Sequence, residues 1–210
     1  MAGAVLLRNG FVAEGMVWLY RVEIGGNLEC DGGKFHNPAV ANVAESGRAL
    51  IAEGAKVAGA VLLRNGFAAE GMVWLSGAEI GGNLDCDRGK FQNPEVADLA
   101  GSGRALIAEG AKVAGAVYLR YGFAAEGTVW LSSAEIGGSL ECDGGKFQNG
   151  SGRALIAEGA KVARSVLLRN EFAAEGTVWL FGAEIGGSLE CSGGKFRNPA
   201  KADIFGSGWP

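Results

Sequence analysis

The decapeptide AEIGGNLDCD at residues 78–87 occurs in four versions along this 210-residue chain. The other versions are VEIGGNLECD at 22–31, AEIGGSLECD at 134–143 and AEIGGSLECS at 183–192. Each places one cysteine among acidic or polar residues, a pattern that fits either a reactive site or a structural repeat. Repetition favours a repeat architecture, in which each unit needs its neighbours in order to bury its apolar face.

A longer repeat surrounds the decapeptide. MAGAVLLRNGF at 1–11 returns in variant form at 57–67, 113–123 and 162–172, so the intervals are 56, 56 and 49 residues. The third interval is shorter because the segment after Phe147 has lost seven residues, as is typical of a surface loop. We predict one domain over 1–197, with repeats at 1–56, 57–112, 113–161 and 162–197 and a tail or partial cap at 198–210.

Each long repeat contains four units of about eleven residues, in which apolar residues alternate with others before a glycine-rich or charged corner. No segment has the length and 3.6-residue period of a helix. We therefore predict an all-β, parallel, right-handed β-solenoid, in which each unit supplies one strand and one turn. In the second repeat, the inward-facing pairs are Val61/Leu63, Val73/Leu75, Leu84/Cys86 and Leu106/Ala108.

Two such units are expected in each coil. This gives about 22 residues and a narrow core, whereas four units would leave a lumen too wide to fill. With two units, opposite charges also stack at successive coils about 4.8 Å apart, which fixes the register. The two charge ladders predicted in this way are Arg8, Asp31, Arg64, Asp87, Arg120, Asp143 and Arg169, and Glu23, Lys56, Glu79, Lys112, Glu135, Lys161 and Glu184.

The cysteines Cys30, Cys86, Cys142 and Cys191 occupy an inward position of the repeat. They are predicted to form a core column of small hydrophobic side chains. Successive members lie two coils apart, about 9.6 Å, which is too far for a disulfide, so free thiols and a reducing cytoplasm are expected. Metal binding is disfavoured, because the flanking acids point away from the sulfur and no Cys-x-x-Cys pair exists.

Other chemistry finds little support. The chain has a single histidine, His36, which is not repeated with the cysteines, and every acidic residue belongs to a repeated column rather than to a unique site. The glycine patterns match neither a calcium-binding β-roll nor a nucleotide-binding strand–turn–helix. We expect no catalytic residue, no cofactor and no metal.

Composition narrows the range of partners. The net charge is −4, with acidic and basic residues interspersed, so no nucleic-acid footprint is present. No stretch approaches the roughly 18 apolar residues of a membrane-spanning helix, and the start lacks the pattern of a signal peptide. We expect a cytoplasmic protein that does not insert into membranes.

One outward column is apolar and continuous, about 30 Å long, and exposed stripes of this size mark interaction sites. Two explanations remain open: the loops at 36–47 and 92–103 fold back over the stripe, or another chain packs against it. The candidate interface residues are Trp18, Ile51, Trp74, Ile107, Trp130, Ile156 and Trp179.

The ends are expected to matter as well. The chain starts inside a first unit, and its tail RNPAKADIFGSGWP at 197–210 matches an internal loop. Uncapped strands at the ends of a solenoid invite head-to-tail stacking. Alternatively, Phe205 and Trp209 fold over the last coil as a cap.

Residues 61–94, VLLRNGFAAEGMVWLSGAEIGGNLDCDRGKFQNP, resemble a group of functionally uncharacterised bacterial β-helical repeat proteins with the pattern VxLRxGFxAEGxVxLxGAxIGGxLxCxGGxF. The resemblance covers essentially the whole chain. That group is similar to pentapeptide-repeat proteins, because Ala78-Glu79-Ile80 and Gly89-Lys90-Phe91 look like the small-x-large triplet that turns the corners of those square solenoids. Many members of the group have arginine where this chain has its four outward tryptophans.

These observations favour a non-catalytic structural or self-associating scaffold, either dimeric or filament-forming. The expected partner is the chain itself, by lateral pairing or end-to-end stacking. The alternative is a protein- or carbohydrate-binding module of pentapeptide-repeat type, with the tryptophan column as its binding face.

Overall fold

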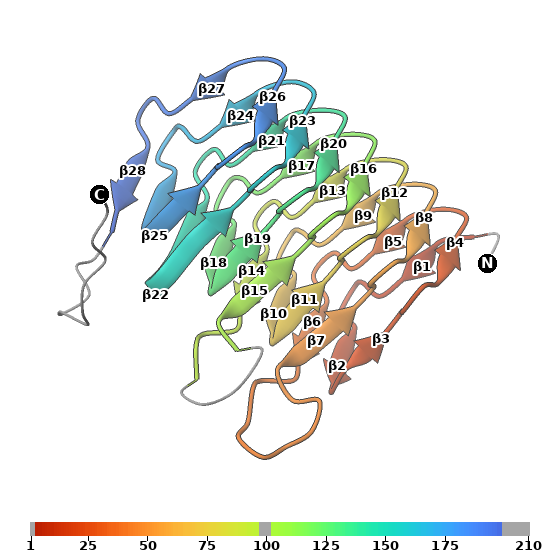
Figure 1. Ribbon diagram of the computed structural model, residues 1–210. Coiled ribbons are helices and arrows are strands. Elements are labelled where there is room, and N and C mark those ends of the chain that lie inside the picture. The colour runs from red at the N-terminus through yellow and green to blue at the C-terminus, as the bar shows by residue number, and fades with distance from the viewer. Residues whose placement is uncertain (1–2, 97–101, 199–210) are drawn as a thin grey trace.

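The computed structural model describes residues 3–96 and 102–198. They form an all-β parallel solenoid of about eight turns, stacked along one axis (Figure 1). Val5 pairs with Leu28, so one turn takes 23 residues, close to the 22 predicted. The next turn is longer, with Leu28 pairing with Val61, because it contains the loop at 37–47. The predicted all-β, parallel β-solenoid is confirmed, while its right-handed sense stays a prediction.

Strands form four columns along the solenoid, grouped into three sheets. The first sheet contains β1 (Val5–Leu6), β5 (Leu28–Glu29), β9 (Val61–Leu62), β13 (Leu84–Asp85), β17 (Val117–Tyr118), β21 (Leu140–Glu141), β24 (Val166–Leu167) and β27 (Leu189–Glu190). The third sheet contains β4 (Glu23–Ile24), β8 (Lys56–Val57), β12 (Glu79–Ile80), β16 (Lys112–Val113), β20 (Glu135–Ile136), β23 (Lys161–Val162) and β26 (Glu184–Ile185).

The second sheet contains the other two columns. One has β2 (Val12–Glu14), β6 (Lys34–His36), β10 (Ala68–Glu70), β14 (Lys90–Gln92), β18 (Ala124–Glu126) and β28 (Lys195–Arg197). The other has β3 (Val17–Trp18), β7 (Arg48–Ile51), β11 (Met72–Trp74), β15 (Arg104–Ile107) and β19 (Thr128–Trp130). The strands β22 (Lys146–Ile156) and β25 (Ala173–Trp179) run through both columns and join them.

The predicted unit of one strand and one turn is wrong in detail, because each eleven-residue unit contains two short strands. The unit that begins at Val61, for example, forms β9 and β10. Between them, Asn65 has a left-handed backbone with a φ of 52°. Glycine and asparagine adopt this conformation at the lowest energetic cost, which explains why they occupy most positions of this corner. The corner column is Asn9, Gly32, Asn65, Arg88, Tyr121, Gly144, Asn170 and Gly193, all with positive φ.

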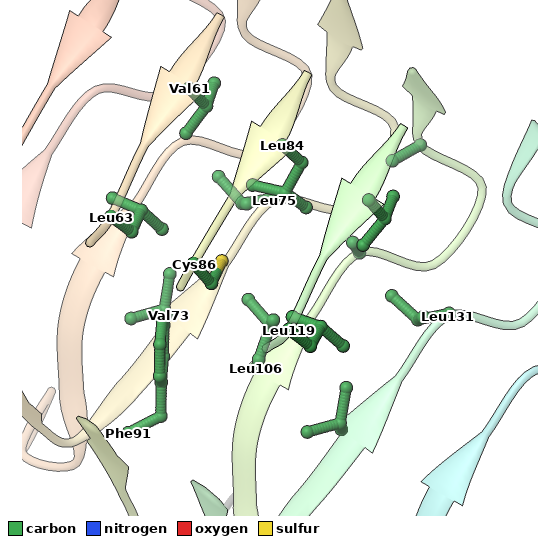
Figure 2. Close-up of a cluster of buried hydrophobic side chains, with 14 of the residues drawn as sticks. Val61, Leu63, Val73, Leu75, Leu84, Cys86, Phe91, Leu106, Leu119 and Leu131 are labelled. Carbon is green, nitrogen blue, oxygen red and sulfur yellow. The ribbon is translucent and has the colours of Figure 1, made fainter. Parts of the chain in front are cut away.

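The core fills the space between the strand columns. Figure 2 shows Val61, Leu63, Leu84 and Cys86, which lie in or just after β9 and β13 of the first sheet. Val73 of β11 and Leu75, which follows that strand, lie beside them. All these side chains are almost completely buried, as the alternation predicted. A narrow core is therefore filled from both sides by one layer of aliphatic groups.

A stack of phenylalanine rings lies at one corner of this core. Consecutive rings are 5.1–5.3 Å apart between centroids and tilted by 41–46°. The stack was not predicted from the sequence, because its rings come alternately from two positions of the repeat. Its members are Phe11, Phe35, Phe67, Phe91, Phe123, Phe147, Phe172 and Phe196.

Gly89 explains the alternation. Ala69 pairs with Phe91, so Phe67 falls opposite Gly89 rather than opposite another phenylalanine. A Cβ atom at Gly89 would lie 2.6 Å from the carbonyl oxygen of Leu63 and 2.8 Å from the Phe91 ring. Each odd turn therefore uses Phe-x-Ala and each even turn Gly-x-Phe, so that one ring per turn fits the column.

We expect the substitution Phe91→Ala to lower the free energy of unfolding by about 3–5 kcal/mol, because it removes a fully buried ring from the middle of the stack. Urea unfolding followed by tryptophan fluorescence measures this loss. Phe196→Ala is the matched control, because Phe196 is 48% exposed and its loss should be less than half as large. Equal losses at the two positions would contradict the stack as a core element.

Arg88 offers a test of the corner column. Its φ of 60° is unfavourable for arginine, whereas glycine occupies the equivalent place at Gly144. Arg88→Gly should therefore raise the free energy of unfolding by about 1 kcal/mol, and the reverse change Gly144→Arg should lower it by a similar amount. Thermal unfolding measures both. A shift in the same direction for the two variants would show that left-handed geometry does not limit stability here.

Candidate interaction surface

The outer surface of the first sheet carries the first charge ladder. Backbone hydrogen bonds connect the turns at this corner, for example from Asn65 N to Asp87 O and from Tyr121 N to Asp143 O. They place the arginines and aspartates of the predicted ladder on successive turns. Its members are Arg8, Asp31, Arg64, Asp87, Arg120, Asp143 and Arg169.

Arginines of this ladder bridge two turns. Arg64 lies 3.2 Å from Asp31 on the preceding turn and 2.9 Å from Asp85 on the following turn. Arg120 repeats the arrangement, at 2.9 Å from Asp87 and 2.6 Å from Glu141.

The ladder continues at Arg169, which pairs with Asp143 at 3.1 Å and Glu190 at 2.7 Å, while Arg8 pairs with Glu29. Hydrogen bonds to Asp143 and Glu190 raise the pKa of Arg169. The charges of this surface are therefore largely neutralised within the chain.

The outer surface of the third sheet carries the second charge ladder. Lys56 and Glu79 form an ion pair at 3.8 Å, and both side chains are more than half exposed. An open groove follows the ladder along all seven strands, and its lining also includes glycine and alanine residues such as Gly25 and Ala58. The ladder residues in register are Glu23, Lys56, Glu79, Lys112, Glu135, Lys161 and Glu184.

The candidate interface residues lie in one row on the second sheet, across β3, β7, β11, β15, β19, β22 and β25. Their register is Trp18, Ile51, Trp74, Ile107, Trp130, Ile156 and Trp179. We call this row the tryptophan stripe.

Exposure along the tryptophan stripe differs from the expectation. Trp18 is 54% exposed, and Trp74, Trp130 and Trp179 are half-buried, but the isoleucines are only 3–5% exposed. Each isoleucine lies between two larger tryptophans in register, which shield it. The stripe therefore offers indole rings at every second turn rather than a continuous apolar strip.

The loop at 37–47 does not lie over the stripe. It extends away from the stacked turns between β6 and β7 (Figure 1). Asn37 closes its base by donating hydrogen bonds to the carbonyl oxygens of Glu45 and Arg48. The second predicted loop lies partly outside the described residues.

Three of the four cysteines are buried, as predicted, but Cys191 is exposed and that part of the prediction is wrong. It lies in the last described turn, and among the described residues only the preceding turn packs against it. Burial raises the pKa of the Cys30 thiol to about 12, with a smaller contribution from Asp31. Burial likewise raises the pKa of Cys86 and Cys142, so these thiols remain protonated and inert near neutral pH.

Comparison with known proteins adds no further assignment: no family model matches the chain, and neither the curated proteins nor the solved structures contain a match. Among residues 3–96 and 102–198, no group of three or more His, Cys, Asp or Glu side chains is placed to hold a metal ion. The same residues include no helix long and apolar enough to cross a membrane. The chain is a β-solenoid repeat protein with a stacked phenylalanine core.

The thiols provide a direct test of the core. At pH 8 we expect a thiol reagent such as DTNB to modify one cysteine per folded chain rapidly, and all four after unfolding in guanidinium chloride. The Cys191→Ser variant should lose the rapid reaction. Rapid modification of two or more thiols in the folded wild-type protein would contradict the buried cysteine column.

Proposed function

We propose that this chain is a non-catalytic β-solenoid scaffold that associates laterally with copies of itself through the tryptophan stripe. The observation that carries the proposal is the stripe itself. Trp18, Trp74, Trp130 and Trp179 lie at every second turn, about 9.6 Å apart, and each is exposed or half-buried. Tryptophan is enriched among the residues that dominate protein–protein binding energy.

The other surfaces support a scaffold rather than an enzyme. Each acidic residue that pairs with an arginine on the first sheet belongs to a repeated column, as Asp31 and Asp87 do. An active site is expected to break a repeat at one place, with a group of abnormal pKa in a cleft. The groove on the third sheet instead repeats two triplets, Glu-Ile-Gly and Lys-Val-Ala, on alternate turns along its whole length.

We also propose kinship with the bacterial repeat proteins that the sequence resembles, and more distantly with pentapeptide-repeat solenoids. The small-x-large triplets support this. Their last residues, Ile80 and Phe91, are buried, and their middle residues, Glu79 and Lys90, are exposed. If this kinship holds, the tryptophans replace the arginines that many of those proteins have at the same outward positions, and they create the proposed contact surface.

A second candidate function is a carbohydrate-binding module. The regular two-turn spacing of the tryptophans favours it, because a row of aromatic rings at equal intervals suits a linear polymer with a repeating apolar face. The exposed ring of Trp18 is the most accessible platform of this row.

The double variant Trp74→Ser, Trp130→Ser tests the two functions. Self-association through the stripe predicts at least 100-fold weaker assembly, because each buried tryptophan of an interface is worth about 2 kcal/mol or more. Sedimentation velocity and negative-stain electron microscopy over a concentration series measure assembly, and circular dichroism checks the fold.

Tyr121→Ser is the control, because Tyr121 is 58% exposed at a different corner. Unchanged assembly in the tryptophan variant would refute the stripe as an interface. Loss of polysaccharide binding without a change in size would favour the carbohydrate-binding module.

A further inference from the structure

Charged side chains flank the tryptophan stripe on both sides. Arg48, Arg104 and Arg153, which we call the arginine row, begin or lie within β7, β15 and β22. The guanidinium group of Arg104 lies 5.0 Å from the Trp130 ring, and that of Arg153 lies 4.4 Å from the Trp179 ring. The arginine row therefore borders the stripe directly.

A row of glutamates lies on the opposite side of the stripe. Glu53, Glu109 and Glu158, the glutamate row, follow the isoleucines by two residues. Backbone hydrogen bonds from Gly77 N to Glu109 O and from Gly110 N to Ser132 O place Glu109 in one column with residues of the neighbouring turns. In that column, Ser76 Oγ accepts a hydrogen bond of 2.7 Å from the indole of Trp74, so the column adjoins the rings.

The two rows belong to the same three turns, each of which has the order arginine, isoleucine, glutamate. Within the described part of the chain, these six side chains form no ion pair of 4 Å or less with one another or with other residues. Arg104, Arg153, Glu109 and Glu158 are exposed. This differs from the first sheet, where Arg64, Arg120 and Arg169 are each held between two acids.

The placement of the rows restricts how two copies can meet. Closed dimers use a two-fold axis, and each contact then occurs twice. An axis parallel to the solenoid exchanges the two sides of the stripe, so the arginine row of one copy meets the glutamate row of the other at the same turn. An axis perpendicular to the solenoid makes the two copies antiparallel and leaves each charged row on the same side of the stripe. The arginine row of one copy then meets the arginine row of the other, and the glutamate rows meet likewise.

We propose that two copies of this chain pack side by side in parallel orientation, with the tryptophan stripes in contact and the arginine row of each copy paired with the glutamate row of the other. This inference rests on the proposed self-association and specifies its geometry. The pairs are Arg48 with Glu53, Arg104 with Glu109 and Arg153 with Glu158, each formed twice. In Figure 1, the surface concerned is the one formed by β3, β7, β11, β15, β19, β22 and β25.

The dimensions of the surface suit a small, reversible dimer. From Trp18 to Trp179 it spans six strand spacings, or about 29 Å. In each turn the arginine precedes the glutamate by five residues. The indoles form a partly apolar centre and the charges form a rim, which is the usual anatomy of a non-obligate interface. Rim charges chiefly set orientation and partner choice.

Charge reversal tests the pairing. An acidic variant carries Arg48→Glu, Arg104→Glu and Arg153→Glu, and a basic variant carries Glu53→Arg, Glu109→Arg and Glu158→Arg. Each variant alone opposes like charges at six places, so we expect its dimer to be at least about 100-fold weaker in sedimentation velocity at physiological salt. An equimolar mixture of the two should recover dimers, because every contact is then between opposite charges.

A matched control carries Lys34→Glu, Lys90→Glu and Lys146→Glu. These exposed lysines lie in the same three turns as the arginine row but in the other column of the second sheet. The control has the same net charge as the acidic variant, and we expect its dimer to be within a few-fold of wild type. An equal loss in this control would overturn the pairing, because it would show a general effect of charge.

Orientation is tested by Trp18→Cys in a Cys191→Ser background. In a parallel dimer, the two copies of residue 18 meet near the axis, so oxidation should give a disulfide-linked dimer. In an antiparallel dimer they lie at opposite ends, and no such link should form, which would overturn the proposal.

The failures of the two proposals are distinguishable. A wild-type chain that remains monomeric at all concentrations overturns both. Assembly that is lost in the Trp74→Ser, Trp130→Ser variant but unaffected by charge reversal supports the stripe as an interface and overturns the parallel pairing of the rows.

Discussion

Backbone hydrogen bonds between successive turns, in one parallel register, are the constraint on which the rest of this structure depends. Val5 is paired with Leu28 and Leu28 with Val61, and the same pairing continues to Leu189. Because the register does not drift, residues at one position of the repeat stack directly on one another. Every core column, charge ladder and surface row follows from this pairing, and a slip by one turn would bring like charges together.

The backbone pairing repeats at every turn, whereas the core side chains repeat at every second turn. A phenylalanine on every turn at the same position would crowd the corner, so Phe67 faces Gly89 and Phe91 faces Ala69. Odd and even turns are therefore different in kind, and the difference extends to the outer surface. Loops occur on even turns, tryptophans on odd turns, and the arginine and glutamate rows again on even turns.

The outer surfaces differ in whether their charges are satisfied within the chain. On the first sheet, Arg120 pairs with both Asp87 and Glu141, so its charge is satisfied within the chain. Beside the tryptophan stripe, Arg104 and Glu109 lie on opposite sides of the buried Ile107 and form no ion pair of 4 Å or less with each other. The proposed contact between copies rests on this combination of a partly apolar centre and separated opposite charges.

The sequence alone determined the solenoid, the length of its turn and the membership of its columns, because strand alternation and charge order are local patterns that a fixed register repeats. Trp18, Ile51 and Trp74 were assigned to one row in this way. Tertiary structure decided what depends on neighbours in space. It showed that Ile51 is buried between larger rings, that Cys191 is exposed in the last described turn, and that each unit bends into two strands at a left-handed residue. The phenylalanine stack also emerged there, because its rings alternate between two sequence positions and meet only when the turns are stacked.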